Sequence, residues 1–183
     1  MGYRRTNYKK RDEYYTPRYA IEPLLPYLEG GATIYCPFDT KESNFVRVFM
    51  EKGFNVIYGD ITEGKDFFKE AIPECDYIIS NPPYSLKADI LTKLNESGKR
   101  WAMLVSADGL FDNKKIFQIF CDNDFELMFL YPRVRYTFNG QTTENSPFQS
   151  AYLCQGVLPK PHVLKFVERK DERQGSFTLI QER

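Results

Sequence analysis

Short apolar runs alternate with helix-like segments along most of the chain. The runs that predict buried strands cover residues 32–36, 54–58, 77–80 and 101–105. Each is followed within a few residues by Gly, Pro, Asn or Asp, which end strands and make turns. Between them, apolar residues recur at helical spacing, as in residues 45–50 behind Ser43, a favourable capping residue. Strands that alternate with helices favour a parallel sheet with helices on both faces.

Further elements are expected on either side of this core pattern. The remaining predicted helices cover residues 16–28, 86–95 and 114–121, and residues 64–68 begin a turn into a short fourth one. Thr16 and Pro17 are a good start for the first helix, as the cap and the first-turn proline. Near the carboxyl end, residues 125–138 predict a strand that becomes irregular at Pro132, and residues 150–155 predict its hairpin partner.

We therefore expect an α/β fold, Rossmann-like and doubly wound, with a mostly parallel sheet and a carboxyl-terminal antiparallel hairpin. The short spacing between Asp60 and Asn81 leaves little room for another strand and helix, so the sheet is expected to be abbreviated. The expected divisions are a basic and aromatic arm at 1–15, one domain at 16–160 and a charged tail at 161–183 with a short strand at 176–180.

Composition bounds the class of protein. With 183 residues and 42% hydrophobic residues, the chain is long enough for one domain that buries about 70% of its unfolded surface. The formal net charge is zero, so any contact with nucleic acid must come from local patches. One such patch is the arm, where tyrosines are interleaved with the basic residues Arg4, Arg5, Lys9, Lys10 and Arg11. The arm can bind phosphates and stack on bases, or it is a solvated terminus.

Cysteine and histidine usage argues against a structural zinc site. Cys36, Cys75, Cys121 and Cys154 are far apart in the chain, and His162 is the single histidine. The pattern indicates a reducing, cytoplasmic setting. No apolar stretch reaches the length of about 20 residues that a membrane-spanning helix needs, and the basic amino end does not resemble a secretory signal.

The sequence Asn81-Pro82-Pro83-Tyr84 directly follows one of the predicted strands. The prolines end the strand because they cannot donate to a ladder, and ligands bind at the carboxyl ends of strands in open α/β sheets. Asn81 offers an amide donor and acceptor, and Tyr84 offers a ring for stacking, which suits a planar group that carries an amino function. The alternative is an ordinary Asn-Pro turn.

Three acids, Asp39, Asp60 and Asp66, also follow predicted strand ends. An acid past the second strand of a doubly wound sheet commonly binds ribose hydroxyls, and Asp60 has that position. A single aspartate at such a place is more often a loop or cap residue, but together with Asn81 the three favour a functional site. Nucleophilic hydrolase and phosphate-binding motifs are absent from the sequence.

Residues 76–84 resemble the Asn-Pro-Pro-Tyr motif of S-adenosylmethionine-dependent adenine-N6 DNA methyltransferases, and the surrounding blocks are similar to small phage-type members of that family. The resemblance covers about residues 15 to 155. It implies a cofactor site formed by Tyr15, Thr16, Pro17, Cys36, Pro37, Phe38, Asp39, Asp60, Asp66 and Phe67. It implies a catalytic site formed by Asn81, Pro82, Pro83 and Tyr84.

The resemblance also implies a mechanism. The side-chain carbonyl of Asn81 and the backbone carbonyl of Pro82 would accept hydrogen bonds from the amino group of a flipped adenine, on which Tyr84 would stack. Phe138 would supply a second ring against the base, or it packs in the core. Methyl transfer would then be a direct displacement governed by orientation, without a cysteine nucleophile.

Two departures from the family pattern keep other functions open. Residues 36–40 contain no glycine, although the family's first motif is glycine-rich, and the chain has no room for a separate target-recognition region. DNA sequence would have to be recognised by the loop at 139–147, the basic arm, or a partner or oligomer. The alternatives are methylation of RNA or of a protein glutamine amide, and a non-catalytic module that binds nucleic acid or a host protein.

Overall fold

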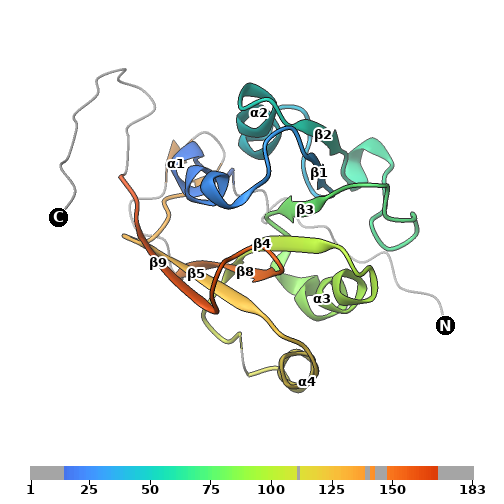
Figure 1. The fold of residues 1–183 in the computed structure, drawn as a ribbon, viewed down its shortest axis with the longest axis vertical. Helices are drawn as coiled ribbons and strands as arrows, with labels where there is room; N and C mark the ends of the chain where they lie inside the picture. The colour runs from blue at the N-terminus through green and yellow to red at the C-terminus, as the bar shows by residue number, and fades with distance from the viewer. Residues whose placement is uncertain (1–14, 111, 139–140, 143–147, 169–183) are drawn as a thin grey trace.

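A seven-stranded sheet forms the centre of the computed structural model, which describes residues 15–110, 112–138, 141–142 and 148–168 (Figure 1). The strand order is β2-β1-β3-β4-β8-β5-β9. The strands of this sheet are β1 (Thr33–Cys36), β2 (Asn55–Tyr58), β3 (Tyr77–Ser80), β4 (Arg100–Ser106), β5 (Glu126–Tyr131), β8 (Ser150–Gln155) and β9 (His162–Phe166). The predicted α/β fold with a mostly parallel sheet is confirmed.

The first four strands run parallel to one another. β1 pairs with β2 and β3, and β3 pairs with β4, so the carboxyl ends of all four strands meet at one edge of the sheet. β8 is antiparallel to both β4 and β5, which confirms the predicted hairpin partners, and β9 adds in parallel to β5. The described residues between β2 and β3 contain no strand, as the expected abbreviation requires.

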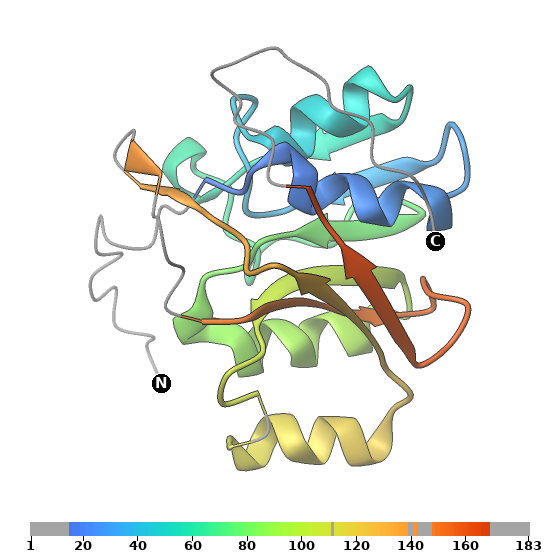
Figure 2. The same cartoon turned by 90° about the vertical axis from the view of Figure 1, so that its left-hand side faces the viewer.

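Helices cover both faces of the sheet because strand side chains alternate between two cores. The helical elements are α1 (Arg18–Ile21), η1 (Glu22–Tyr27), α2 (Asn44–Glu51), η2 (Ile61–Glu63), η3 (Tyr84–Leu86), α3 (Lys87–Glu96) and α4 (Lys114–Asp122). Ile34 and Ile79 pack with α1 and α2, whereas Ile78 packs with α3 and α4. Figure 2 shows the sheet between the two helical layers.

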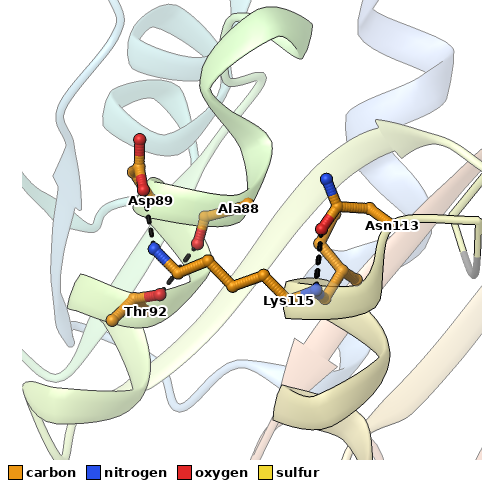
Figure 3. A network of polar contacts seen from close by, with 6 residues as sticks. Ala88, Asp89, Thr92, Asn113 and Lys115 are labelled. Atoms are coloured by element: carbon orange, nitrogen blue, oxygen red, sulfur yellow. Dashed lines mark hydrogen bonds and ion pairs between the residues drawn. The ribbon is translucent and has the colours of Figure 1, made fainter.

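The two helices of the second layer are joined by polar contacts (Figure 3). Lys115 of α4 donates to Asp89 Oδ1 of α3 at 2.7 Å, and its backbone N–H donates to the capping side chain of Asn113 at 2.9 Å. The Thr92 hydroxyl donates to the Ala88 carbonyl oxygen at 2.9 Å within α3. Phe117 of α4 is 53% exposed. Among the described residues, α4 buries Ile116, whereas α3 buries Ile90, Leu91 and Leu94.

Several local predictions are wrong for identifiable reasons. Residues 16–28 form one α-helical turn and then the 3₁₀ helix η1, because Pro23 and Pro26 lack the N–H that an α-helix needs. Thr16 does not cap α1, since Pro17 is the capping residue and no side chain bonds the first turn. Residues 66–70 make a turn in which Lys69 and Glu70 donate to the Asp66 carbonyl oxygen, and no helix follows.

The carboxyl-terminal third also differs from the prediction. The single strand expected over 125–138 is divided at Pro132 into β5 and the two-residue strand β6 (Thr137–Phe138), which pairs with β7 (Gln141–Thr142). β9 was not predicted, and His162, the single histidine, is an exposed residue at the start of that strand. The expected strand at 176–180 and the arm residues 1–14 lie outside the described residues.

Candidate functional site

The polar residues of interest gather where the parallel strands end. β1, β2 and β3 end at Cys36, Tyr58 and Ser80, and the loops that follow carry the candidate residues. An isolated bridge between Asp39 and Gly59 ties the loop after β1 to the loop after β2. The site is therefore built on the shared carboxyl-terminal edge, where parallel sheets place ligand-binding groups.

Asn81 is the first residue after β3, and its two amide atoms have different surroundings. Nδ2 donates to Thr16 Oγ1 at 3.3 Å. Oδ1 is buried and accepts no hydrogen bond from any described residue. A buried acceptor without a partner costs about 1–3 kcal/mol, so folded proteins rarely retain one. Asn81 Oδ1 is thus an acceptor that is desolvated and still free to accept a donor.

The two prolines after Asn81 fix how this loop leaves the sheet. Neither has a backbone N–H, so β3 cannot continue past Ser80. Pro82 is buried, and Pro83 has extended backbone angles and precedes the 3₁₀ turn η3 that begins at Tyr84. The loop therefore reverses directly into α3.

The Tyr84 ring belongs to an aromatic cluster. It packs edge-on against Phe148 with ring centroids 5.2 Å apart, and Phe148 lies 5.7 Å from the ring of Tyr136. Tyr136 is buried and shares a 2.8 Å hydrogen bond with Ser150 Oγ, and burial raises its pKa to about 12. Tyr84 is half-buried, with its position set by packing against residues that follow β6.

Asp39 is a buried carboxylate that is occupied by internal hydrogen bonds. Its Oδ1 accepts from the Ser43 hydroxyl and its Oδ2 accepts from the Ser80 hydroxyl. Ser43 also caps α2 by accepting from the Phe45 N–H at 3.2 Å. Burial raises the pKa of Asp39 from 3.8 to about 6, against the opposing effect of the two serine hydroxyls. Asp39 therefore connects the end of β3 to the start of α2.

Asp60 and Asp66 both have local structural roles. Asp60 caps η2, with Oδ1 accepting from the Thr62 N–H at 2.7 Å and the Glu63 N–H at 3.3 Å. Asp66 accepts from the Phe68 N–H at 3.0 Å and pairs with Lys69 at 2.8 Å, and the Lys69 hydrogen bond lowers its pKa. Asp60 lies close enough to Asp39 for its charge to contribute to the raised pKa of that residue. Their role toward a cofactor stays a prediction.

Two aromatic rings, Phe38 and Phe67, form an apolar surface at the same edge beside these acids. Phe38 packs edge-on against Phe67 with centroids 5.0 Å apart. Lys93 of α3 donates to the Phe67 carbonyl oxygen and lies 4.9 Å above the Phe67 ring, which holds the turn at 66–70 against α3. Cys36 and Pro37 are buried at the end of β1, and Cys36 packs in the core on the other face of the sheet, where burial raises the pKa of its thiol well above its ordinary value.

The segment Tyr15-Thr16-Pro17 connects three parts of the fold. Tyr15 pairs with Thr137 of β6 through two backbone hydrogen bonds of 2.9 and 3.1 Å. The Thr16 carbonyl oxygen accepts from Asn44 Nδ2 of α2 at 2.9 Å, and its hydroxyl accepts from Asn81. The structure thus brings Thr16 and Asn81 together, although they are 65 residues apart in the chain.

Two residues at this edge were missed by sequence reasoning. Asn44 looks like an ordinary first helical residue, and only the fold shows that it bonds Thr16. Lys87, the first residue of α3, donates to the Ser106 carbonyl oxygen at the end of β4 at 3.2 Å. Burial lowers the pKa of Lys87, while the charge of Asp108 acts in the opposite direction. The sequence signal for Lys87 was its position shortly after the Asn-Pro-Pro-Tyr sequence.

Other predicted site residues are not placed by the structure. The basic residues Arg4, Arg5, Lys9, Lys10 and Arg11 lie outside the described residues, as does most of the loop at 139–147. Phe138 ends β6, but its side chain is outside the described part, so its predicted role is untested. Over the described residues, no helix is both long enough and apolar enough to span a membrane.

Comparison with known proteins adds information about the fold. No protein-family model matches the chain, and no curated protein matches it in sequence. A crystal structure described as the modification subunit of a type I restriction enzyme from Vibrio vulnificus YJ016 has a TM-score of 0.54 at 14% identity. A type I restriction-modification system methyltransferase subunit from Streptococcus thermophilus has a TM-score of 0.50, also at 14% identity.

The two alignments include most of this chain but only about half of each neighbour. The alignments cover 88% and 81% of this chain, but only 48% and 45% of the two solved chains. This chain therefore spans about half the length of each neighbour, and at 14% identity the likeness is one of fold. The fold of this chain is shared with about half of each of these two subunits.

Proposed function

We propose that this protein transfers a methyl group from S-adenosylmethionine to the N6 amino group of adenine in DNA. The observation that carries the proposal is the buried Oδ1 of Asn81 at the carboxyl end of β3, which accepts no hydrogen bond within the described part of the chain. The Asn-Pro-Pro-Tyr sequence supports it, as does the fold shared with two restriction-modification methyltransferase subunits.

The Asn81 loop would hold and orient the target base. The amino group of a base inside a duplex is engaged in pairing, so adenine must be flipped out before it can react. Asn81 Oδ1 and the Pro82 carbonyl oxygen would accept the two N–H bonds of that amino group, which raises electron density on its nitrogen. Tyr84 would stack on the flipped ring, a contact worth about 1–3 kcal/mol. Packing against Phe148 limits the positions that the Tyr84 ring can adopt.

The cofactor site would lie beside this loop at the same edge. S-adenosylmethionine, when bound, supplies the electrophilic methyl group. The residues fit its adenosine portion, because Asp60 is a carboxylate after β2 and the rings of Phe38 and Phe67 form an adjacent apolar surface. Asp39 is a poor candidate for direct cofactor contact, since both of its oxygens already accept hydroxyl groups.

DNA would be bound through local positive charge. Lys87 lies beside the proposed base site, and in the described chain its ammonium has no ion-pair partner. A partly desolvated ammonium next to an extruded nucleotide is placed to contact a backbone phosphate. The basic arm would add further contacts, and recognition of a DNA sequence would come from a partner or an oligomer. Such an enzyme would act in the cytoplasm.

The decisive experiment is methyl transfer from labelled S-adenosylmethionine to unmethylated DNA, with RNA and a glutamine-containing protein as alternative substrates. Label in N6-methyladenine is expected with DNA, and Asn81→Ala should abolish it. Asn95→Ala is the matched control, because Asn95 Oδ1 is also buried and unpartnered among the described residues. Asn95 lies near the far end of α3, about 12 Å along the helix from Lys87. Full activity in Asn81→Ala would refute the assigned role.

The second candidate is a non-catalytic module that binds nucleic acid or a host protein at the same edge. It is favoured by the turn after β1, which has no glycine and whose carboxylate is buried in internal hydrogen bonds. Titration calorimetry with S-adenosylmethionine separates the two candidates. Cofactor binding supports the enzyme, whereas DNA binding without any cofactor binding supports the module.

A further inference from the structure

The Asn81 amide presents two chemically different ends to its surroundings. Its Oδ1 can only accept a hydrogen bond, and its Nδ2 can only donate. If Oδ1 accepts a hydrogen bond from the target amino group, the partly buried Nδ2 faces the other way and needs an acceptor of its own. Without one, the amide would keep an unsatisfied donor in the working state and would rotate to relieve it.

We infer that Thr16 is a positioning residue whose hydroxyl anchors the Nδ2 end of Asn81, so that Oδ1 is presented to the target amino group. This inference rests on the proposed methyl-transfer function and assigns to Thr16 a role in orienting Asn81. The contact that carries it is the 3.3 Å hydrogen bond from Asn81 Nδ2 to Thr16 Oγ1. The complementary observation is that Asn81 Oδ1 has no partner among the described residues.

Thr16 is itself held in place from three directions. The residue is 6% exposed, so its side chain has little freedom to move away from Asn81. Asn44 Nδ2 of α2 binds its carbonyl oxygen at 2.9 Å, and the neighbouring Tyr15 pairs with Thr137 of β6. On the other side, Pro17 fixes the backbone at the start of α1. An anchor that is rigid in this way restricts the amide plane of Asn81 before any substrate arrives.

The test compares two variants of Thr16 that differ in one functional group. Thr16→Val keeps the shape of the side chain and removes the acceptor, whereas Thr16→Ser keeps the hydroxyl. We expect Thr16→Val to lower kcat about two- to tenfold, the effect of one neutral hydrogen bond, with little change in the KM for S-adenosylmethionine. Thr16→Ser should retain most of the activity. Urea unfolding of both variants checks that each is folded.

A second measurement does not depend on activity. The side-chain amide resonances of Asn81, assigned by their disappearance in Asn81→Ala, should shift in Thr16→Val and stay near their wild-type positions in Thr16→Ser. This readout separates the two proposals. If the wild-type protein transfers no methyl group, the proposed function fails, and the amide spectrum still decides whether Thr16 anchors Asn81.

Three results would overturn the inference. The first is an unchanged kcat in folded Thr16→Val. The second is a higher KM or weaker calorimetric binding of S-adenosylmethionine with kcat unchanged, which would make Thr16 a cofactor ligand. The third is an Asn81 amide spectrum that Thr16→Val does not alter. A drop in kcat that Thr16→Ser restores, together with the amide shift, supports it.

Discussion

The buried carboxyl group of Asp39 should make the free energy of unfolding of this protein rise as the pH falls. Its carboxyl is buried at the junction of β1, α2 and β3, where burial raises its pKa from 3.8 to about 6. Between these two pH values the folded state binds a proton that the unfolded state does not bind. The free energy of unfolding therefore rises as the pH falls through this window. In the other direction, this added stability is lost as the pH rises through about 6.

The size of this effect follows from the two pKa values. A shift from 3.8 to about 6 corresponds to about 3 kcal/mol in total, which is fully present only below the unfolded pKa. Between about pH 7.5 and about pH 4.5, roughly 2 kcal/mol of it should appear. The negative charge of nearby Asp60 contributes to the raised pKa in the same direction, whereas the Ser43 and Ser80 hydroxyls oppose it.

Asp39→Asn isolates this contribution because asparagine has the same shape and does not titrate. Urea unfolding of both proteins at about pH 4.5 and about pH 7.5 gives a double difference in which the other carboxyl groups largely cancel. The wild type should gain roughly 2 kcal/mol over the variant at the lower pH. A difference that is independent of pH, or that favours the wild type more at high pH, would refute a buried, proton-binding Asp39.

Two further predictions concern other residues of the fold and the site. Glu126 accepts backbone N–H groups of Gly156, Val157 and Leu158 at 2.8 to 3.0 Å, so Glu126→Ala should lower the free energy of unfolding by about 2–3 kcal/mol. Glu126→Gln, which keeps one acceptor, should lose less in the same urea titration. Lys87→Met should weaken DNA binding and reduce the slope of log affinity against log salt by about one. Its control is Lys99→Met, since Lys99 pairs with Glu74 just before β4 begins, and an equal slope in both variants would contradict a phosphate contact at Lys87.

Much of the fold could be predicted because its signals are local. The apolar runs of β1 to β4 and the Ser43 cap of α2 gave these elements nearly their observed bounds, but β2, which was expected to be buried, lies at the end of the strand order and is only partly buried. The apolar spacing over 16–28 predicts a longer α-helix than the chain forms, because Pro23 and Pro26 lack the N–H that α-helical hydrogen bonds need. β9 is difficult to predict because Pro159 and Pro161 are typical of a loop, but Pro161 directly precedes the strand, where a missing N–H is tolerated.

The position of the candidate site could be predicted from the sequence, but the hydrogen bonds among its residues could not. Asn81 could be found because a motif at a strand end is visible in the sequence. The hydrogen bond between Asn81 and Thr16 joins residues that are 65 positions apart in the chain and depends on the packing of α1, so no local sequence pattern predicts it. Asp39 was predicted to lie at the edge of the sheet, which is correct. That Ser43 and Ser80 would occupy both of its oxygens could only be learned from the fold.

The polar atoms at this edge differ in whether the fold leaves them free to bind a ligand, and this difference identifies the candidate hydrogen-bond acceptor. Asp39 has both oxygens occupied by serine hydroxyls, and Asp66 accepts a backbone N–H of its own turn and pairs with Lys69. Asp60 accepts the N–H groups of its own turn through Oδ1. Asn81 Oδ1 is desolvated and has no partner in the described chain, so a ligand that donates to it recovers a cost of about 1–3 kcal/mol that the free protein carries. Desolvation alone does not define a site, because Asn95 Oδ1 shares the property near the opposite end of α3. Position at the carboxyl ends of parallel strands supplies the second criterion, and only Asn81 of this pair meets both.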